Sequence, residues 1–195
     1  MSGMRIGIGG GVFDPIHTGH LFLFNECADR LALTKVLLVP TYKAVHKISD
    51  AISAYADRRE MVRIVCENDE KFELCEVEKE AGGPSYTLDT IRSLKKLYPD
   101  AEWFLIVGLD NLEKMEDWHQ PDRIFEEANI VVGSRPVDSA PVDAKYRDRV
   151  IWLEMPKLDI SSTVLRERLR SGRSIRYLVP PEIEDYILTH KLYVK

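Results

Sequence analysis

The sequence predicts an α/β fold: a doubly wound parallel sheet with helices on both faces and a small helical part at the C-terminus. Short apolar runs of strand length alternate with stretches of helical period along the 195 residues, which is typical of a parallel sheet covered on both faces. A glycine-rich turn follows the first apolar run, where such folds bind ligands. No repeat, low-complexity tract or linker divides the chain, so we expect a single domain over residues 1–195.

Six apolar runs are expected to be strands because each has strand length and precedes a turn or a helical stretch. In chain order they are Arg5–Gly9, Lys35–Pro40, Phe72–Val77, Glu102–Val107, Ile130–Val132 and Val150–Leu153. Apolar and polar residues alternate in Phe72–Val77, whereas Lys35–Pro40 and Glu102–Val107 are apolar almost throughout. Trp103 and Trp152 fall inside strands, so we expect both in the core.

Six stretches repeat their apolar residues at helical spacing. The expected helices are one that starts at Thr18, and then Ala54–Cys66, Thr87–Leu97, Pro121–Ala128, Ser161–Ser171 and Pro181–His190. Ser53 is the expected N-cap of the second helix, and Pro181 suits a first helical position, where its missing N–H costs nothing. Pro136–Arg149 carries two prolines, several aspartates and few apolar residues, so we expect an exposed loop there with at most a short helix.

The formal net charge of −5 argues against a protein that relies on non-specific attraction to nucleic acid. The N-terminus lacks a basic segment followed by a long apolar one, and no apolar run reaches the ~20 residues that span a bilayer. Cys27, Cys66 and Cys75 form no C-x-x-C pair, so we expect reduced, buried thiols. Together these features indicate a cytoplasmic protein without a nucleic acid or membrane partner.

The segment Gly9–His20 reads GGGVFDPIHTGH and carries the strongest functional pattern. Glycines let backbone N–H groups approach a ligand, and a helix start offers unpaired N–H groups and the positive end of its dipole. His17 and His20 lie three residues apart, so both can point to one side, and Gly19 leaves room for a ligand. The alternatives are histidines that only cap or pack, and a zinc site, which the spacing and the lack of a nearby cysteine disfavour.

Ile160–Arg166 reads ISSTVLR and enters a second helix with anion-binding features. Hydroxyls at a helix start, with free N–H groups behind them, can form an anion site. Arg166 lies one turn inside this helix and can lean back toward its N-terminus. Asp159, Ser161 or Ser162 could also be a plain N-cap, and both interpretations can hold together.

The motif HxGH after a glycine-rich strand exit resembles the nucleotidyltransferase superfamily related to class I aminoacyl-tRNA synthetases, and ISSTxxR resembles its second signature. The resemblance implies a Rossmann-like fold in which His17 and His20 contact ATP phosphates, while Ser162 and Arg166 hold the triphosphate. It also places four residues of the strand exit at ATP: Gly10, Gly11, Val12 and Phe13.

The segment VPTYKAVHK, residues 39–47, departs from the related family at one position. That family usually shows Pro-His-Lys at the end of this segment, and here Val45 replaces the proline while His46 and Lys47 remain. The resemblance implies that Lys47 is a phosphate ligand, on a loop that the missing proline leaves less rigid. Taken alone, Lys47 would be a solvated loop lysine.

The superfamily motif cannot choose among cytidylyltransferases, pantetheine-phosphate adenylyltransferases and pyridine-nucleotide adenylyltransferases. Three other segments resemble bacterial nicotinate-nucleotide adenylyltransferases: PSYTLDT (84–90), GLDNLEKMEDWHQ (108–120) and most of 174–193. This resemblance covers nearly the whole chain and is weakest at Pro136–Arg149. It implies ATP and nicotinic acid mononucleotide as substrates, and nicotinic acid adenine dinucleotide and pyrophosphate as products.

The nicotinate ring and its carboxylate require different partners. A pyridinium ring favours an aromatic face, for which tryptophan is best, and Trp118 lies in a loop past a strand end, with core packing as its alternative role. The carboxylate needs donors, which the helix start at Thr87 can supply; the resemblance adds the amide of His119. The other ATP-binding residues that the resemblance implies are Gly108, Asp110, Ser134 and Arg135.

The expected reaction needs no general base, because the attacking mononucleotide phosphate is already anionic. Mg²⁺ bound with the ATP phosphates would need few protein ligands, and we expect no metal site built from side chains. Two alternative functions remain: an adenylyltransferase for another acceptor, nicotinamide mononucleotide or phosphopantetheine, and a non-catalytic nucleotide-binding module. A homo-oligomer is also left open.

Overall fold

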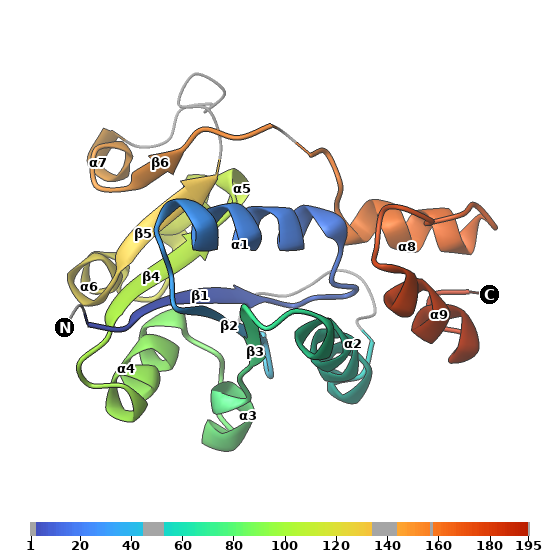
Figure 1. Ribbon diagram of the computed structural model, residues 1–195, viewed down its shortest axis with the longest axis horizontal. Helices are drawn as coiled ribbons and strands as arrows, with labels where there is room; N and C mark the ends of the chain where they lie inside the picture. Colours follow the sequence, from blue (N-terminus) through green and yellow to red (C-terminus); the bar gives the residue numbers. More distant parts are fainter. Residues whose placement is uncertain (1–2, 45–52, 134–143, 157, 195) are drawn as a thin grey trace.

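A computed structural model describes residues 3–44, 53–133, 144–156 and 158–194 (Figure 1). Six strands form one sheet in the order β3-β2-β1-β4-β5-β6, and every neighbouring pair is parallel. The strands are β1 (Arg5–Gly11), β2 (Lys35–Pro40), β3 (Phe72–Leu74), β4 (Glu102–Val107), β5 (Asn129–Gly133) and β6 (Ile151–Leu153). This topology confirms the doubly wound prediction, with the strand order reversing between β1 and β4.

Helices cover both faces of the sheet and build two apolar cores (Figure 1). The first core takes residues from α1 (Thr18–Arg30), α2 (Tyr55–Asn68), α8 (Ser162–Arg170) and α9 (Pro181–Thr189). The second takes residues from α3 (Val77–Ala81), α4 (Thr87–Leu97), α5 (Leu109–Glu113), the 3-10 turn η1 (Met115–Asp117), α6 (Pro121–Glu127) and α7 (Ala144–Arg147). The C-terminal helices α8 and α9 thus pack into the same core as α1 and α2.

Alternating isoleucine and glycine in β1 set how closely α1 lies against the sheet. Ile6 and Ile8 belong to the second core, whereas Gly7 and Gly9 face the first core. A Cβ atom at Gly9 would lie 2.8 Å from the Phe24 ring of α1, closer than side chains pack. The missing side chain lets α1 lie directly on β1, so the start of α1 reaches the carboxyl end of that strand.

The predicted N-cap of α2 is wrong. The helix begins at Tyr55, and its N-cap residue is Ala54, which makes no side-chain cap hydrogen bond. The peptide groups of Ser53 have other partners. Its N–H donates to the Asp14 carboxylate at 3.3 Å, and its carbonyl accepts from Nε of Arg58 at 3.2 Å. Ser53 is therefore held by two buried charged side chains rather than by the helix it precedes.

The predicted strand Phe72–Val77 is too long. β3 ends at Leu74, and Val77 begins the unpredicted helix α3. The Glu78 side chain of α3 accepts a hydrogen bond from the backbone N–H of Tyr42 at 3.2 Å. This tertiary contact outweighs the local alternation of apolar and polar residues that favoured a strand.

Two further differences concern short elements. The helical turns α5 and η1 after β4 are five and three residues long, too short for a periodic pattern to reveal.

Within the predicted loop, α7 matches the expected short helix. Tyr146 of α7 is nevertheless buried, and its ring stacks on Phe125 with centroids 5.4 Å apart. This part of the loop is therefore not fully exposed.

The core predictions for tryptophan and cysteine hold in part. Trp103 is buried, while Trp152 is half-buried against the same core. All three cysteines are free; Cys27 is buried, and Cys66 and Cys75 are half-buried. Burial raises the pKa of each of these thiols. Across the described ranges, no helix has both the length and the apolar character that crossing a membrane requires.

Candidate functional site

β1 and β4 separate near the carboxyl end of β1. β1 pairs with β2 as far as Gly11 and Pro40, but with β4 only as far as Gly9 and Ile106. Open α/β sheets bind ligands where the strand order reverses, which here is the crevice between β1 and β4. Gly10 is exposed, and a Cβ added to it would meet nothing within 4 Å. The backbone of β1 is therefore accessible at this crevice.

His17 and His20, together called the histidine pair, cap α1 by binding each other. The backbone N–H of His17 donates to Nδ1 of His20 at 3.3 Å, and the backbone N–H of His20 donates to Nδ1 of His17 at 3.4 Å. The two rings stack with centroids 3.6 Å apart and an interplanar angle of 21°. The two histidines therefore cap α1, and the cap itself places both rings on one side.

The reciprocal cap determines where the histidine pair carries its protons. Each Nδ1 accepts a backbone hydrogen bond, so we assign the proton of each neutral ring to Nε2. Burial lowers the pKa of His17 to about 4. Burial, with a contribution from the charge of His17, lowers the pKa of His20 well below its usual value. At neutral pH the pair therefore offers two uncharged Nε2–H donors.

Gly19 and Phe13 lie against the rings of the histidine pair. A Cβ atom at Gly19 would lie 3.1 Å from Nδ1 of His17, so the space predicted for a ligand beside this glycine lies against the His17 ring. Phe13 is buried with a φ of 52°, and its ring meets the His20 ring edge-on with centroids 5.3 Å apart. Both residues act on the geometry of the histidine pair.

Arg166 and Ser162 of α8 bind the backbone of the loop after β1, residues 12–16. Nη1 of Arg166 donates to the carbonyl of Asp14 at 2.8 Å, and the Ser162 hydroxyl donates to the carbonyl of Pro15 at 2.9 Å. Ser161, rather than Ser162, is the N-cap of α8. The two residues predicted to hold a triphosphate therefore lie against the predicted ATP loop, and the Ser162 hydroxyl is directed at that loop.

A buried carboxylate, which is not among the predicted site residues, lies in the middle of this loop. Asp14 is 3% exposed, and its carboxylate accepts a hydrogen bond from the Tyr193 hydroxyl at 2.6 Å. Nη1 of Arg166 lies 3.9 Å from the same carboxylate. The hydrogen bond to Asp14 raises the pKa of Tyr193, although burial contributes most to that shift. The C-terminal tail and α8 thus meet at Asp14.

Arg58 of α2 is the second buried charged residue that is not among the predicted site residues. It is 5% exposed and binds backbone carbonyls at the ends of β1 and β2. A usable signal was present in the sequence, since Arg58 falls on the same helix face as Met61, Val62 and Val65. An arginine on the apolar face of a helix needs a buried partner.

The residues predicted to bind a nicotinate nucleotide gather beyond β3 and β4. Thr87 is the first residue of α4, and Tyr86 precedes it as the N-cap residue. The exposed His119 ring lies beside the Tyr86 ring, with centroids 4.5 Å apart. Trp118 is half-buried and packs against the second core. The fold therefore brings Thr87 and His119 together through Tyr86, while Trp118 keeps part of its surface accessible.

Gly108 and Asp110 lie on the β4 side of the crevice. Gly108 follows β4 directly and is the N-cap residue of α5. A Cβ atom at Gly108 would lie 2.8 Å from Oδ1 of the exposed Asp110, so this carboxylate folds back over the glycine. Lys47, with Val45 and His46, and the pair Ser134 and Arg135 lie outside the described residues.

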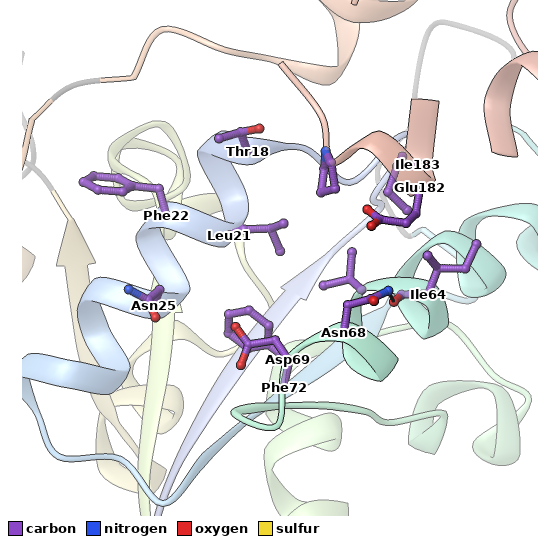
Figure 2. A pocket seen from close by; sticks show the side chains of 12 residues that line it. Thr18, Leu21, Phe22, Asn25, Ile64, Asn68, Asp69, Phe72, Glu182 and Ile183 are labelled. Atoms are coloured by element: carbon purple, nitrogen blue, oxygen red, sulfur yellow. Dashed lines mark hydrogen bonds between the residues drawn. The ribbon is translucent and has the colours of Figure 1, made fainter. Parts of the chain in front are cut away.

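A pocket of about 380 Å³ lies between α1, α2 and the start of α9 (Figure 2). Its lining is mainly apolar and includes Leu21, Phe22 and Ile183. None of the predicted site residues that the structure describes lines it. This pocket flanks α1, and neither residue of the histidine pair lines it.

The fold and this site define a nucleotidyltransferase. The model of the cytidylyltransferase-like family matches residues 8–168 of the chain. A relative from Rubrobacter xylanophilus, with the curated name "Probable nicotinate-nucleotide adenylyltransferase", is 38% identical and aligns with 97% of this chain and 92% of its own. A relative of the same name from Dehalococcoides mccartyi is 37% identical over 99% and 98% of the two chains. The chain belongs to the nicotinate-nucleotide adenylyltransferase family.

Solved structures share this fold at lower sequence identity. The nicotinic acid mononucleotide adenylyltransferase of Plasmodium falciparum complexed with NaAD superposes with a TM-score of 0.81, at 21% identity over 97% of each chain. The same protein complexed with APC gives a TM-score of 0.78. The likeness supports the Rossmann-like architecture described above.

Proposed function

We propose that this chain transfers the adenylyl group of ATP to nicotinic acid mononucleotide, forming nicotinic acid adenine dinucleotide and pyrophosphate. The histidine pair carries the proposal. Its two rings stack at the start of α1, the first helix after β1, and each has an Nε2–H donor, in a member of the nicotinate-nucleotide adenylyltransferase family. The family indicates the acceptor, and the site supplies donors for the ATP phosphates.

In this reaction a phosphate oxygen of the mononucleotide forms a bond to the α-phosphorus of ATP. The bond from that phosphorus to the oxygen that bridges to the β-phosphate breaks, and its electron pair leaves with pyrophosphate. The attacking oxygen is already anionic, so no side chain has to remove a proton. The protein therefore acts by aligning the two phosphates and stabilising the charge that shifts onto pyrophosphate.

We assign the ATP phosphates to His17, His20 and Arg166. The two imidazoles donate from Nε2 without carrying a charge, and Arg166 adds a positive charge held away from water at 6% exposure. The remaining predicted ligands of ATP are Gly10, Gly11, Val12, Phe13, Lys47, Gly108, Asp110, Ser134, Arg135 and Ser162.

We propose that Mg²⁺ enters the site with the triphosphate. Asp14, the carboxylate in the loop after β1, already accepts hydrogen bonds from Tyr193 and Ser53, which fits an ion held mainly by phosphate oxygens and water. When bound, Mg²⁺ supplies charge neutralisation between the phosphates.

A panel of acceptors tests the proposed function. With ATP and Mg²⁺, pyrophosphate release should be fastest with nicotinic acid mononucleotide, by about tenfold or more in kcat/KM over the nicotinamide form, because the amide cannot replace charge-assisted hydrogen bonds to a carboxylate. Faster turnover with the amide or with phosphopantetheine would overturn the acceptor. ATP binding without turnover on any acceptor would instead identify a nucleotide-binding module.

Replacing Trp118 with alanine should raise the KM for the pyridine nucleotide about tenfold and leave the KM for ATP within about twofold, because the ring loses its stacking partner. Initial-rate measurements with each substrate varied in turn give both constants. Trp152→Phe is the control, since Trp152 packs against the same core from β6. Equal increases of both KM values in the Trp118 variant would contradict ring stacking.

We also propose that the protein works in the cytoplasm. The three free cysteines support this location, because thiols persist in a reducing compartment.

A further inference from the structure

Arg58 joins three backbone segments at the carboxyl ends of β1 and β2. Its Nη1 donates to the carbonyl of Val12 at 2.7 Å and to the carbonyl of Thr41 at 2.9 Å. Its Nε donates to the carbonyl of Ser53 at 3.2 Å. Arg58 is 5% exposed, so these three bonds are largely shielded from water, which strengthens hydrogen bonds from a charged donor.

The bonds from Arg58 lie directly beyond the end of the β1–β2 ladder. The last paired residues are Gly11 and Pro40, and the N–H of Thr41 still donates to the carbonyl of Gly11 at 2.8 Å. There the ladder stops, and one guanidinium nitrogen binds the next carbonyl of each chain segment. Arg58 thereby holds together two segments at the point where they would otherwise separate.

Holding the carbonyl of Val12 also orients the following N–H group. A peptide unit is planar and trans, so the N–H of Phe13 points opposite to the carbonyl of Val12 and away from Arg58. Phe13 has a φ of 52°, and its ring rests edge-on against the His20 ring. The orientation of a predicted ATP ligand and the support of one catalytic ring both depend on the peptide that Arg58 binds.

We propose that Arg58 is a positioning residue for ATP, which holds Val12 and Phe13 in their binding geometry without touching the substrate. The inference rests on the proposed function and adds a residue to its site. A guanidinium suits this role because it stays charged when buried and donates from nitrogens that point in different directions. A lysine ammonium has one nitrogen and cannot reach the Ser53 carbonyl and the other two carbonyls together.

Two substitutions test the inference. Arg58→Met, which removes every donor, should raise the dissociation constant of a non-hydrolysable ATP analogue and the KM for ATP by about tenfold, with the KM for nicotinic acid mononucleotide changed by less than about twofold. Arg58→Lys should fall between Arg58→Met and the unmodified chain. Calorimetry gives the dissociation constants, initial rates give the KM values, and circular dichroism with gel filtration reports folding.

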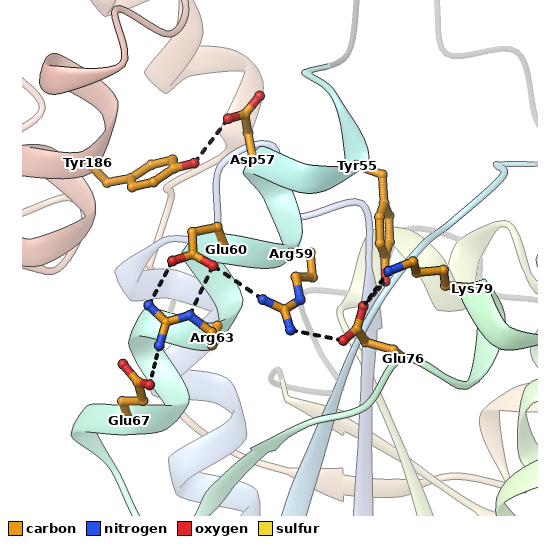
Figure 3. Close-up of polar contacts among 9 residues, drawn as sticks. All are labelled: Tyr55, Asp57, Arg59, Glu60, Arg63, Glu67, Glu76, Lys79 and Tyr186. Carbon is orange, nitrogen blue, oxygen red and sulfur yellow. Dashed lines mark hydrogen bonds and ion pairs between the residues drawn. The ribbon is translucent and has the colours of Figure 1, made fainter.

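Arg59→Lys is the matched control. Arg59 neighbours Arg58 on α2, but it pairs with the carboxylates of Glu60 and Glu76 at 3.3 and 3.1 Å (Figure 3). This variant should bind ATP like the unmodified chain.

Two results would overturn the inference. The first is unchanged ATP affinity, or equal loss for both substrates, in a folded Arg58→Met or Arg58→Lys variant. The second is failure of both variants to fold, which would show that Arg58 stabilises the whole fold instead of positioning the ATP site. Absence of ATP binding by the unmodified chain would reject the proposed function itself and is measured separately.

Discussion

Replacing His20 with alanine should lower kcat about 100-fold, because the reaction loses one preorganised donor of ~3 kcal/mol in the transition state. The loss should appear in steady-state pyrophosphate release at saturating concentrations of both substrates. The variant also loses the Nδ1 atom that accepts the His17 N–H at 3.3 Å. Its free energy of unfolding should therefore fall by about 1 kcal/mol, as for the loss of a helix cap.

Two further substitutions at His20 separate its cap from its donor. Asparagine places an acceptor near the position of Nδ1, so His20→Asn should recover stability but stay slow. Glutamine places an N–H group near the position of Nε2, so His20→Gln should recover part of kcat. Near-normal turnover in a folded His20→Ala or His20→Asn variant would remove His20 from the mechanism.

The charge state of the histidine pair determines how kcat/KM should depend on pH. Burial holds the pKa of His17 at about 4, so this ring is already neutral throughout the neutral range. We expect kcat/KM to show no step from the pair between about pH 7 and 9, where the mononucleotide phosphate is fully ionised. A rate that falls tenfold per pH unit across this range would show that a protonated imidazole is required.

Replacing Arg166 with methionine should lower kcat/KM for ATP about 100-fold, because the buried positive charge of the proposed phosphate site is lost together with the hydrogen bond to the Asp14 carbonyl. Methionine fills a similar volume without a donor, which limits the cavity term. Initial rates with ATP varied, at saturating mononucleotide, measure the change.

Arg168 provides the matched control on the same helix. Its Nε donates to the carbonyl of Ser174 at 2.8 Å, so Arg168→Met also removes an arginine-to-backbone hydrogen bond from α8, but away from the loop after β1. This variant should keep near-normal activity. Equal losses in the Arg166 and Arg168 variants would point to a general weakening of α8.

The elements that the sequence predicts accurately have clear local ends. β2, β4 and α4 agree with their predicted bounds, because Pro40, Gly108 and Pro99 mark or follow the point where each periodic pattern stops. β3 was predicted too long because the alternation of apolar and polar residues continues to Val77, whereas the strand ends at Leu74. The N–H of Cys75 makes one more hydrogen bond to β2, to the carbonyl of Leu38 at 2.9 Å, before α3 begins at Val77.

The histidine pair could be predicted because its motif is local, whereas the partner of Asp14 could not. Asp14 and Tyr193 are 179 residues apart in the chain, and no periodic pattern links a turn near one end with a tail at the other. The contact of Ser162 with the loop after β1 could not be predicted either. A serine at a helix start suggests an anion site, but only the packing of α8 against the loop shows that its hydroxyl donates to Pro15.

The bond between Tyr193 and Asp14 joins two positions that lie 179 residues apart in the chain. The segment between them contains every strand from β2 to β6, so the contact closes a loop around most of the sheet. The entropy of loop closure opposes so distant a contact in the unfolded chain. We therefore expect this bond to form late in folding, after the strands have paired.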